Sequence, residues 1–260
     1  MDLNLLEATP ISDEVLRAVY ASDQDMYPVA LSYERLCSWV AAYPELSIGF
    51  SLRNERSSST TAAAASDLGD VYGVIIVLPL RRVFWEKLLD GRLKEQDIEA
   101  WSMFPPVSGL HTTGEVAEVG LHVYHVERFP SSRPKSVSTS AVSTEEASVR
   151  TGFAGFALGE VLRRARAKRD WQVVGISAIT ATPSGKRTFE TLGFAPTGYR
   201  EAFVATAMTG TTGDAQVDGQ VEMISIGPQH TNDEPGDEQT KKIADGRAII
   251  SVYEMAVKYV

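Results

Sequence analysis

The stretch WQVVGISAITATPSGKRTFETLGFAPTGY, residues 171–199, carries the pattern from which we predict the fold of this chain. Its first ten residues form a nearly unbroken apolar run, which is typical of a strand covered on both faces. Pro183 then begins a short helical pattern, and Gly193 follows as a residue well suited to end a helix. Another strand is expected over residues 199–207. This order of strand, helix and strand predicts a layered α/β structure.

Two patterns lie upstream of this stretch. Residues 115–128, EVAEVGLHVYHVER, alternate between apolar and polar side chains like a half-buried strand. Residues 152–170, GFAGFALGEVLRRARAKRD, place apolar residues at helical spacing and gather cations at the end of the helix, where they complement its dipole.

The remaining apolar segments complete the sheet. We expect further strands over residues 3–8, 46–53, 71–80 and 248–257, with one extra strand at 221–226. Helices are expected over residues 12–21, 33–42 and, in two pieces broken near Gly91, 82–101. The last strand pairs with the one at 199–207. The predicted fold class is therefore α/β (α+β), with a mixed, mostly antiparallel central sheet flanked by helices.

Three polar segments interrupt these elements, at about residues 55–69, 130–149 and 209–246. They have few groups to bury, so we predict mobile insertions there. The chain has 260 residues and is 43% hydrophobic, which is enough for one substantial core. We therefore expect a single domain over residues 1–260.

Composition excludes several classes of function. The net charge of −9 argues against a nucleic-acid partner, because binding to the phosphate backbone needs a broad basic surface. No apolar run reaches the roughly 18 residues of a membrane span, and the first residues do not resemble a targeting segment. Cys37 is the one cysteine, so no internal disulfide forms. We expect a cytoplasmic protein, with a nuclear location left open, that is a monomer or a homodimer.

Taken in order, residues 115–205 resemble the GCN5-related N-acetyltransferase (GNAT) superfamily. The most specific element is TFETLGFAPTGY, residues 188–199, which is similar to the family's Tyr-Glu-x-x-Gly-Phe helix end and the strand after it. The resemblance implies an acetyl-CoA-dependent N-acetyltransferase that transfers an acetyl group directly to an amine of a small molecule or a peptide. Acetyl-CoA would be the co-substrate, and no metal is implied.

The resemblance also implies where the cofactor binds. A helix N-terminus presents free N–H groups to the pyrophosphate. The family's loop pattern falls here on Arg150, Thr151, Gly152, Phe153, Ala154 and Gly155, with Phe153 in the middle glycine position. A shifted register would use Gly152 and Ala154 instead. The pantetheine arm would pair with the backbone of Val123, Tyr124, His125 and Val126. The candidates for binding the 3′-phosphate are Lys186, Arg163, Lys168 and Arg187.

The strand at 115–128 supplies the candidate catalytic groups. With a period of two, Glu118, His122 and Tyr124 share one face with Val126, whereas Val123 and His125 lie on the other. A carboxylate or an imidazole can take the proton of the acceptor ammonium, directly or through one water. Glu118 or His122 is therefore the candidate base.

The residue that acts as the acid is harder to assign, because the family often has a tyrosine at the position of Phe189, which has no hydroxyl. Tyr124, Tyr199, Tyr253 or a water molecule would then protonate the CoA sulfur. Two alternatives stay open: a catalytically silent GNAT-fold protein that binds acyl-CoA or a protein partner, and a sheet-based interaction module without a cofactor. The acidic balance of the chain favours a cationic acceptor.

Overall fold

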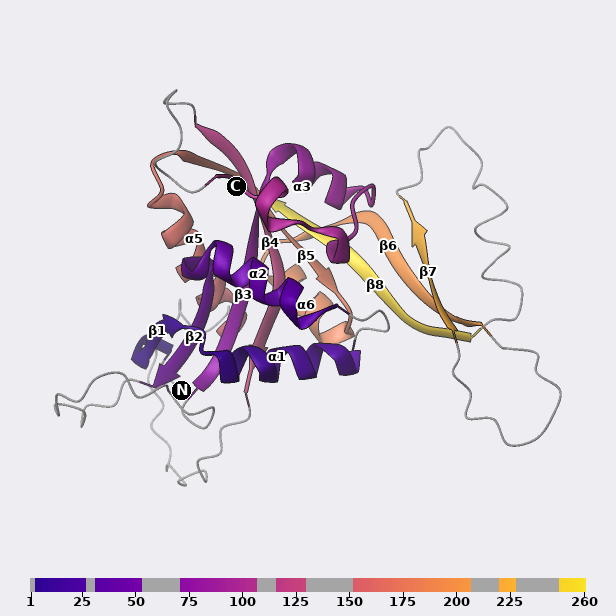
Figure 1. Ribbon diagram of the computed structural model, residues 1–260, viewed down its shortest axis with the longest axis horizontal. Helices are drawn as coiled ribbons and strands as arrows, with labels where there is room; N and C mark the ends of the chain where they lie inside the picture. Colours follow the sequence, from indigo (N-terminus) through magenta and orange to yellow (C-terminus); the bar gives the residue numbers. More distant parts are fainter. Residues whose placement is uncertain are drawn as a thin grey trace, which may run out of the picture.

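A single eight-stranded sheet runs through the computed structural model (Figure 1). The structure describes residues 3–26, 31–52, 71–106, 116–129, 152–206, 220–227 and 248–260. The strand order is β1-β2-β3-β4-β5-β8-β6-β7. The strands are β1 (Leu6–Pro10), β2 (Ser47–Leu52), β3 (Val71–Arg81), β4 (Ala117–Arg128), β5 (Trp171–Thr180), β6 (Ala195–Thr206), β7 (Gln220–Ile226) and β8 (Ala248–Tyr259).

The pairing of the strands is mixed, as the sequence predicts. β4 and β5 pair in parallel, and the other neighbouring strands pair antiparallel. The predicted closing strands pair as β6 and β8, and the short run at 221–226 forms β7 against β6. Long stretches of β6, β7 and β8 extend away from the helices in Figure 1.

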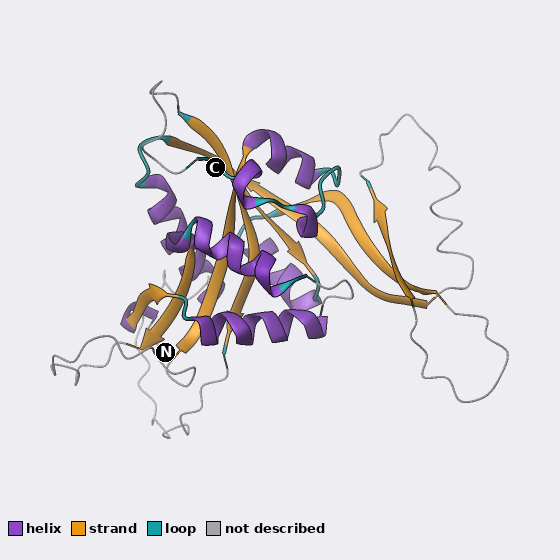
Figure 2. Ribbon diagram, in the orientation of Figure 1, coloured by secondary structure: helices purple, strands orange, loops and turns teal. Residues whose placement is uncertain are grey.

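Helices lie on both sides of the sheet, as Figure 2 shows. Contacts place α1, α2 and α3 on one face and α5 on the other. The α-helices are α1 (Asp13–Met26), α2 (Tyr33–Ala42), α3 (Arg82–Leu89), α4 (Ala100–Met103), α5 (Gly152–Arg166) and α6 (Pro183–Thr191). The short 3-10 helices are η1 (Leu3–Leu5), η2 (Pro44–Leu46) and η4 (Glu95–Asp97). Among the described residues, no helix combines the length and the apolar character needed to cross a membrane.

Local chemistry explains where several helices begin and end. The Ser32 hydroxyl accepts a hydrogen bond from the Arg35 amide at the start of α2, and Thr182 does the same for Gly185 at the start of α6. Gly193 follows α6 with a φ of 85°, a value that favours glycine. The predicted helix at 82–101 is divided more finely than expected, into α3, η4 and α4.

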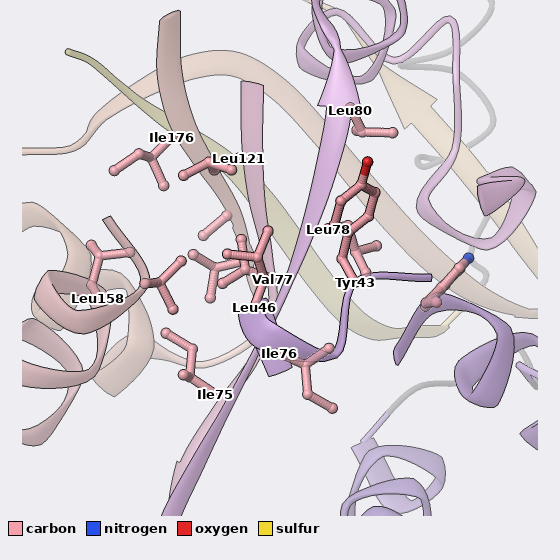
Figure 3. Packing of buried hydrophobic residues seen from close by; sticks show 14 of the residues in the cluster. Tyr43, Leu46, Ile75, Ile76, Val77, Leu78, Leu80, Leu121, Leu158 and Ile176 are labelled. Atoms are coloured by element: carbon pink, nitrogen blue, oxygen red, sulfur yellow. The ribbon is translucent and has the colours of Figure 1, made fainter. Parts of the chain in front are cut away.

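The core lies on both faces of β3, as its continuous apolar sequence predicts. Ile75 and Val77 point toward α5, where Leu158 is found, while Ile76 and Leu78 point the other way (Figure 3). All five side chains are at least 93% buried. Because both faces are covered, the sequence of this strand does not show which of its faces points toward which helices.

A β-bulge at Tyr124 changes the orientation of the second half of β4. Ile76 of β3 lies opposite His125 and Val77 lies opposite Val123, so Tyr124 is an extra residue. His125 therefore lies on the same face as His122, and Val126 lies on the opposite face. The sequence-based assignment of His125 and Val126 to faces was wrong, because strict alternation does not allow for a bulge.

The parallel pair of β4 and β5 opens at one end. Its ladder runs from Ala117 opposite Trp171 to Val123 opposite Ala178. Beyond Val123, β4 continues to Arg128, whereas the last residues of β5 pair with β8 on their other side. This separation leaves space between the two strands.

Some predictions fall outside the described residues. They include the mobile segments at 55–69 and 130–149, the insertion at 209–246 except for 220–227, and the candidate residues Arg150 and Thr151.

Candidate functional site

Two adjoining cavities lie where β4 and β5 separate. The outer cavity, of about 700 Å³, lies between the beginning of α5 and α6. The inner chamber, of about 280 Å³, lies between β4, β5 and α1. They share one wall, which is formed by Val126, Glu127, Thr182, Gly185 and Phe189.

The outer cavity has the character of an anion site. Gly152, Phe153 and Ala154 form the first turn of α5 at its wall, and a helix N-terminus offers free N–H groups and a positive dipole end. Arg128 and Arg187 also line it, and both are exposed. The groups at this wall therefore suit phosphate oxygens.

Phe153 does not fill the space in front of α5. Its ring packs edge-on against Phe50 and Tyr72, with ring centroids 5.5 Å apart in both pairs. A Cβ atom on Gly73 would lie 2.5 Å from Cζ of Phe153, so that glycine makes room for the ring. Gly152 has a φ of 57° and nothing within 4 Å of its Cβ position. The large side chain is thus turned toward the sheet.

The four cations that the sequence suggested as ligands of the 3′-phosphate lie in different parts of the structure. Arg163 and Lys168, at the far end of α5, pair with Glu160 and Glu45. Lys186 pairs with Glu254 at 2.6 Å and lines neither cavity.

Arg187 lines the outer cavity, and so does Arg128, which the sequence analysis missed. Its position in the cavity depends on the β4 bulge, which the sequence pattern did not reveal.

The inner chamber is acidic. Asp23 of α1, Glu95 of η4 and Glu127 of β4 all line it, together with the apolar Val123 and Ile179. These three carboxylates come from elements that are far apart in the sequence, so sequence analysis did not select them. The chamber therefore suits a cationic group.

His125 forms ion pairs with two of these carboxylates. Its Nε2 lies 3.1 Å from Glu127 and its Nδ1 lies 3.6 Å from Asp23. Burial disfavours the charged imidazolium, but the interactions with Asp23 and Glu127 outweigh it and raise the pKa of His125 to about 9. Asp23 also accepts a hydrogen bond from the Tyr124 hydroxyl. At neutral pH His125 is thus a cation and not a base.

Glu95 has a different partner. Its Oε1 lies 2.6 Å from Nε2 of His122, and Nδ1 of His122 lies 2.9 Å from Oγ of Ser177. Ser177 in turn accepts a hydrogen bond of 2.9 Å from Nε1 of Trp85. His122 is fully buried and lines neither cavity. It contacts the chamber through Glu95.

Glu118 lies away from the other candidates. It sits at the opposite end of β4 from the open end of the β4–β5 pair, and its exposed carboxylate pairs with Arg82 at 2.9 Å. A strand rises about 3.3 Å per residue, so six residues separate Glu118 from Tyr124 by about 20 Å. The structure does not bring Glu118 into the chamber.

The candidate acids are also separated. Tyr253 lines the inner chamber, and Phe189 lies at the junction of the two cavities. The phenol of Tyr199 instead donates to Glu201 at 2.6 Å, outside both cavities. Burial, followed by nearby carboxylates, raises the pKa of Tyr124 and Tyr199 well above the usual range.

Comparisons with known proteins found matches among solved structures alone. No protein-family model matches the chain, and no curated protein does. Among solved structures, NAA60 of Arabidopsis thaliana bound to a bisubstrate analogue is 10% identical, with a TM-score of 0.44 and coverage of 98% of this chain and 99% of that one. Naa50 of the same plant, bound to CoA-Ac-MVNAL, is 10% identical, with a TM-score of 0.38 and coverage of 85% and 97%. Mosquito arylalkylamine N-acetyltransferase like 5b is 9% identical, with a TM-score of 0.42 and coverage of 98% and 100%.

The architecture of the sheet, rather than these scores, defines the class of fold. The structure has a mostly antiparallel sheet flanked by helices, which is the arrangement that the sequence predicted, with one parallel pair that opens at its end. The predicted fold class, a mixed and mostly antiparallel sheet flanked by helices, is therefore confirmed.

Proposed function

We propose that this protein is an acetyl-CoA-dependent N-acetyltransferase that transfers an acetyl group directly to an amine. The observation that carries the proposal is the position of the two cavities. A cavity with an anion-binding wall and a chamber with carboxylates meet where β4 and β5 separate. A molecule with phosphates at one end and a reactive thioester at the other would span them.

The cofactor would bind along the outer cavity. Its phosphates would contact the first turn of α5, Arg128 and Arg187. The residues from Tyr124 to Val126 form no ladder with β5, and this supports the proposal that their backbone pairs with the pantetheine arm. The thioester would then lie near Phe189, at the entrance to the chamber.

The acceptor would bind in the inner chamber as an ammonium. We propose that Glu95 is the base and acts directly or through one water. Glu95 lines the chamber, and in its hydrogen bond with His122 the carboxylate is the acceptor. The neutral amine then attacks the thioester carbon, the C–N bond forms and the C–S bond breaks. The nitrogen gives up its second proton as the amide forms, and Tyr253 or a water molecule would pass this proton to the leaving thiolate, so that one proton ends on Glu95 and one on CoA.

The first test is calorimetric titration with acetyl-CoA and with CoA that lacks the 3′-phosphate. We expect micromolar binding of acetyl-CoA that weakens without the phosphate. Arg187→Ala should weaken binding, whereas Arg163→Ala, at the other end of α5, should not. Absence of acetyl-CoA binding would overturn the proposal. Binding without turnover of any amine in a broad panel would instead favour the catalytically silent alternative.

The choice of base has its own test. Glu95→Gln should lower kcat by about 10²–10⁴-fold with little change in acetyl-CoA affinity, because it removes the proton acceptor. Asp97→Asn, on the exposed side of the same short helix, is the matched control. Glu118→Gln decides between the two assignments: a loss of rate in that variant, with Glu95→Gln unaffected, would return the role to Glu118.

A further inference from the structure

A buried chain of hydrogen bonds leads from the core to the inner chamber. It runs from Trp85 of α3 through Ser177 of β5 and His122 of β4 to Glu95 of η4. Trp85, Ser177 and His122 are at most 1% exposed, and Glu95 is 5% exposed. Glu95 is the member that lines the chamber.

The direction of this chain follows from its first member. The indole of Trp85 can only donate a hydrogen bond, so Oγ of Ser177 accepts it. The Ser177 hydroxyl then has its own proton to donate, and Nδ1 of His122 lies 2.9 Å away. If Nδ1 accepts, the ring proton is on Nε2, which faces Oε1 of Glu95 at 2.6 Å. Each donor then meets one acceptor.

The other protonation states of His122 fit this chain less well. With the proton on Nδ1 alone, Nδ1–H would donate to the second lone pair of Oγ of Ser177, the Ser177 hydroxyl proton would lose its acceptor, and a lone pair on Nε2 would face the carboxylate of Glu95. With both nitrogens protonated, Nδ1 would donate to Ser177, and the buried hydroxyl proton of Ser177 would lose its acceptor. A buried donor without a partner is costly, so the neutral ring is favoured.

Trp85 is held firmly enough to impose this direction. Its ring packs on Gly120 and Gly175, where an added Cβ would come within 2.0 Å and 2.5 Å of the indole. The ring also packs edge-on against Tyr259, with centroids 5.9 Å apart. The indole N–H therefore has a fixed position beneath the sheet.

We propose that His122 is a positioning residue for Glu95, and that the Trp85–Ser177 pair holds His122 as its neutral Nε2–H tautomer. In that state His122 donates to Glu95 and keeps its carboxylate oriented. This differs from His125, which is a cation between its two carboxylates. The kinetic part of the proposal rests on the proposed function, whereas the tautomer does not.

The tautomer is tested by NMR of the histidine ring nitrogens in the wild-type protein. His122→Asn identifies the His122 signals among those of the four histidines of the chain. We expect one protonated nitrogen, Nε2, at pH 7. An imidazolium or an Nδ1–H tautomer would overturn the proposal. This measurement needs neither acetyl-CoA nor an amine, so its failure is distinct from failure of the proposed function.

Ser177→Ala tests the origin of the tautomer. It removes the donor to Nδ1 with little change in volume, so the His122 signals should shift toward another tautomer or a mixture. An unchanged spectrum in a folded variant would show that Ser177 does not impose the state.

The positioning role is tested by comparing two variants of His122. His122→Gln retains an amide that can donate to Glu95, whereas His122→Leu has no donor. We expect His122→Leu to lower kcat about tenfold to a hundredfold, the range typical of groups that orient another functional group, with an unchanged KM for acetyl-CoA. His122→Gln should recover much of this loss. Equal kcat values in the two folded variants would refute the positioning role.

Discussion

Trp85 shows at the scale of one residue how the core shapes the site. The large ring fits under β4 and β5 because Gly120 and Gly175 lack side chains, and its N–H then directs the Ser177–His122 pair. The sequence contains both glycines within strands, but it does not say what approaches them. That information requires the position of α3.

Gly120→Ala should therefore destabilise the protein strongly. Its Cβ would lie 2.0 Å from Cγ of Trp85, so the ring would have to move, and overpacking of this kind costs about 1–3 kcal/mol. Urea denaturation would measure the change in the free energy of unfolding. The matched control is Gly159→Ala at an exposed position of α5, where nothing lies within 4 Å of the added Cβ, and it should stabilise by about 0.5–1 kcal/mol. Equal effects of the two variants would contradict the packing argument.

At the scale of the element, the bulge in β4 decides which groups meet in the chamber. Without the extra residue Tyr124, His125 would point toward α5 and could not reach Asp23. The period of the sequence predicted the strand, which the structure confirms at residues 117–128. The bulge was not predicted, because it depends on the pairing with β3.

His125 should make the stability of the protein fall as the pH rises. Its folded-state pKa of about 9 lies above the ordinary value of 6.5, so its contribution is fully present below pH 6.5 and is lost as the pH rises through 9. The loss is on the order of 3 kcal/mol. Denaturation at pH 6 and pH 9.5 would measure it, and His125→Gln should flatten the difference. A wild-type protein that is equally stable at both values would contradict the prediction.

At the scale of the whole molecule, Lys94 connects the outer strands to the body of the sheet. It donates hydrogen bonds to Tyr199 of β6 and Ser225 of β7, while its neighbour Glu95 binds His122 of β4. Tyr199 donates to the buried Glu201, whose pKa is raised, chiefly by burial. The charge of Lys94 favours the ionised form of Glu201.

Lys94→Met should consequently destabilise the protein through Glu201. The variant leaves a buried carboxylate without its nearby cation, and we expect a loss of about 2 kcal/mol at pH 7, less than for a fully buried pair because Lys94 is partly exposed. Glu201→Gln should recover most of that loss in the double variant. A double-mutant cycle in urea would measure the coupling, and simple additivity of the two changes would show that the residues act independently.

Local sequence patterns were enough to predict the order of most elements and the bounds of several, whereas β1, α1 and β6 begin or end three to five residues from their predicted limits. α2 and β5 have the predicted bounds, and the closing strands pair as expected, because apolar periodicity and capping residues act over short distances. The sequence also determined the resemblance to the GNAT superfamily, through an ordered series of such elements.

Which chemical groups meet depends on long-range packing. Asp23, Glu95 and Glu127 come together across more than a hundred residues, while Glu118, on the same strand as Glu127, is left outside. Local pattern specifies how a segment folds, but a site depends on where segments end relative to one another. In this protein that depends on a bulge, a separation of two strands and a short 3-10 helix, and each of these is fixed by long-range packing.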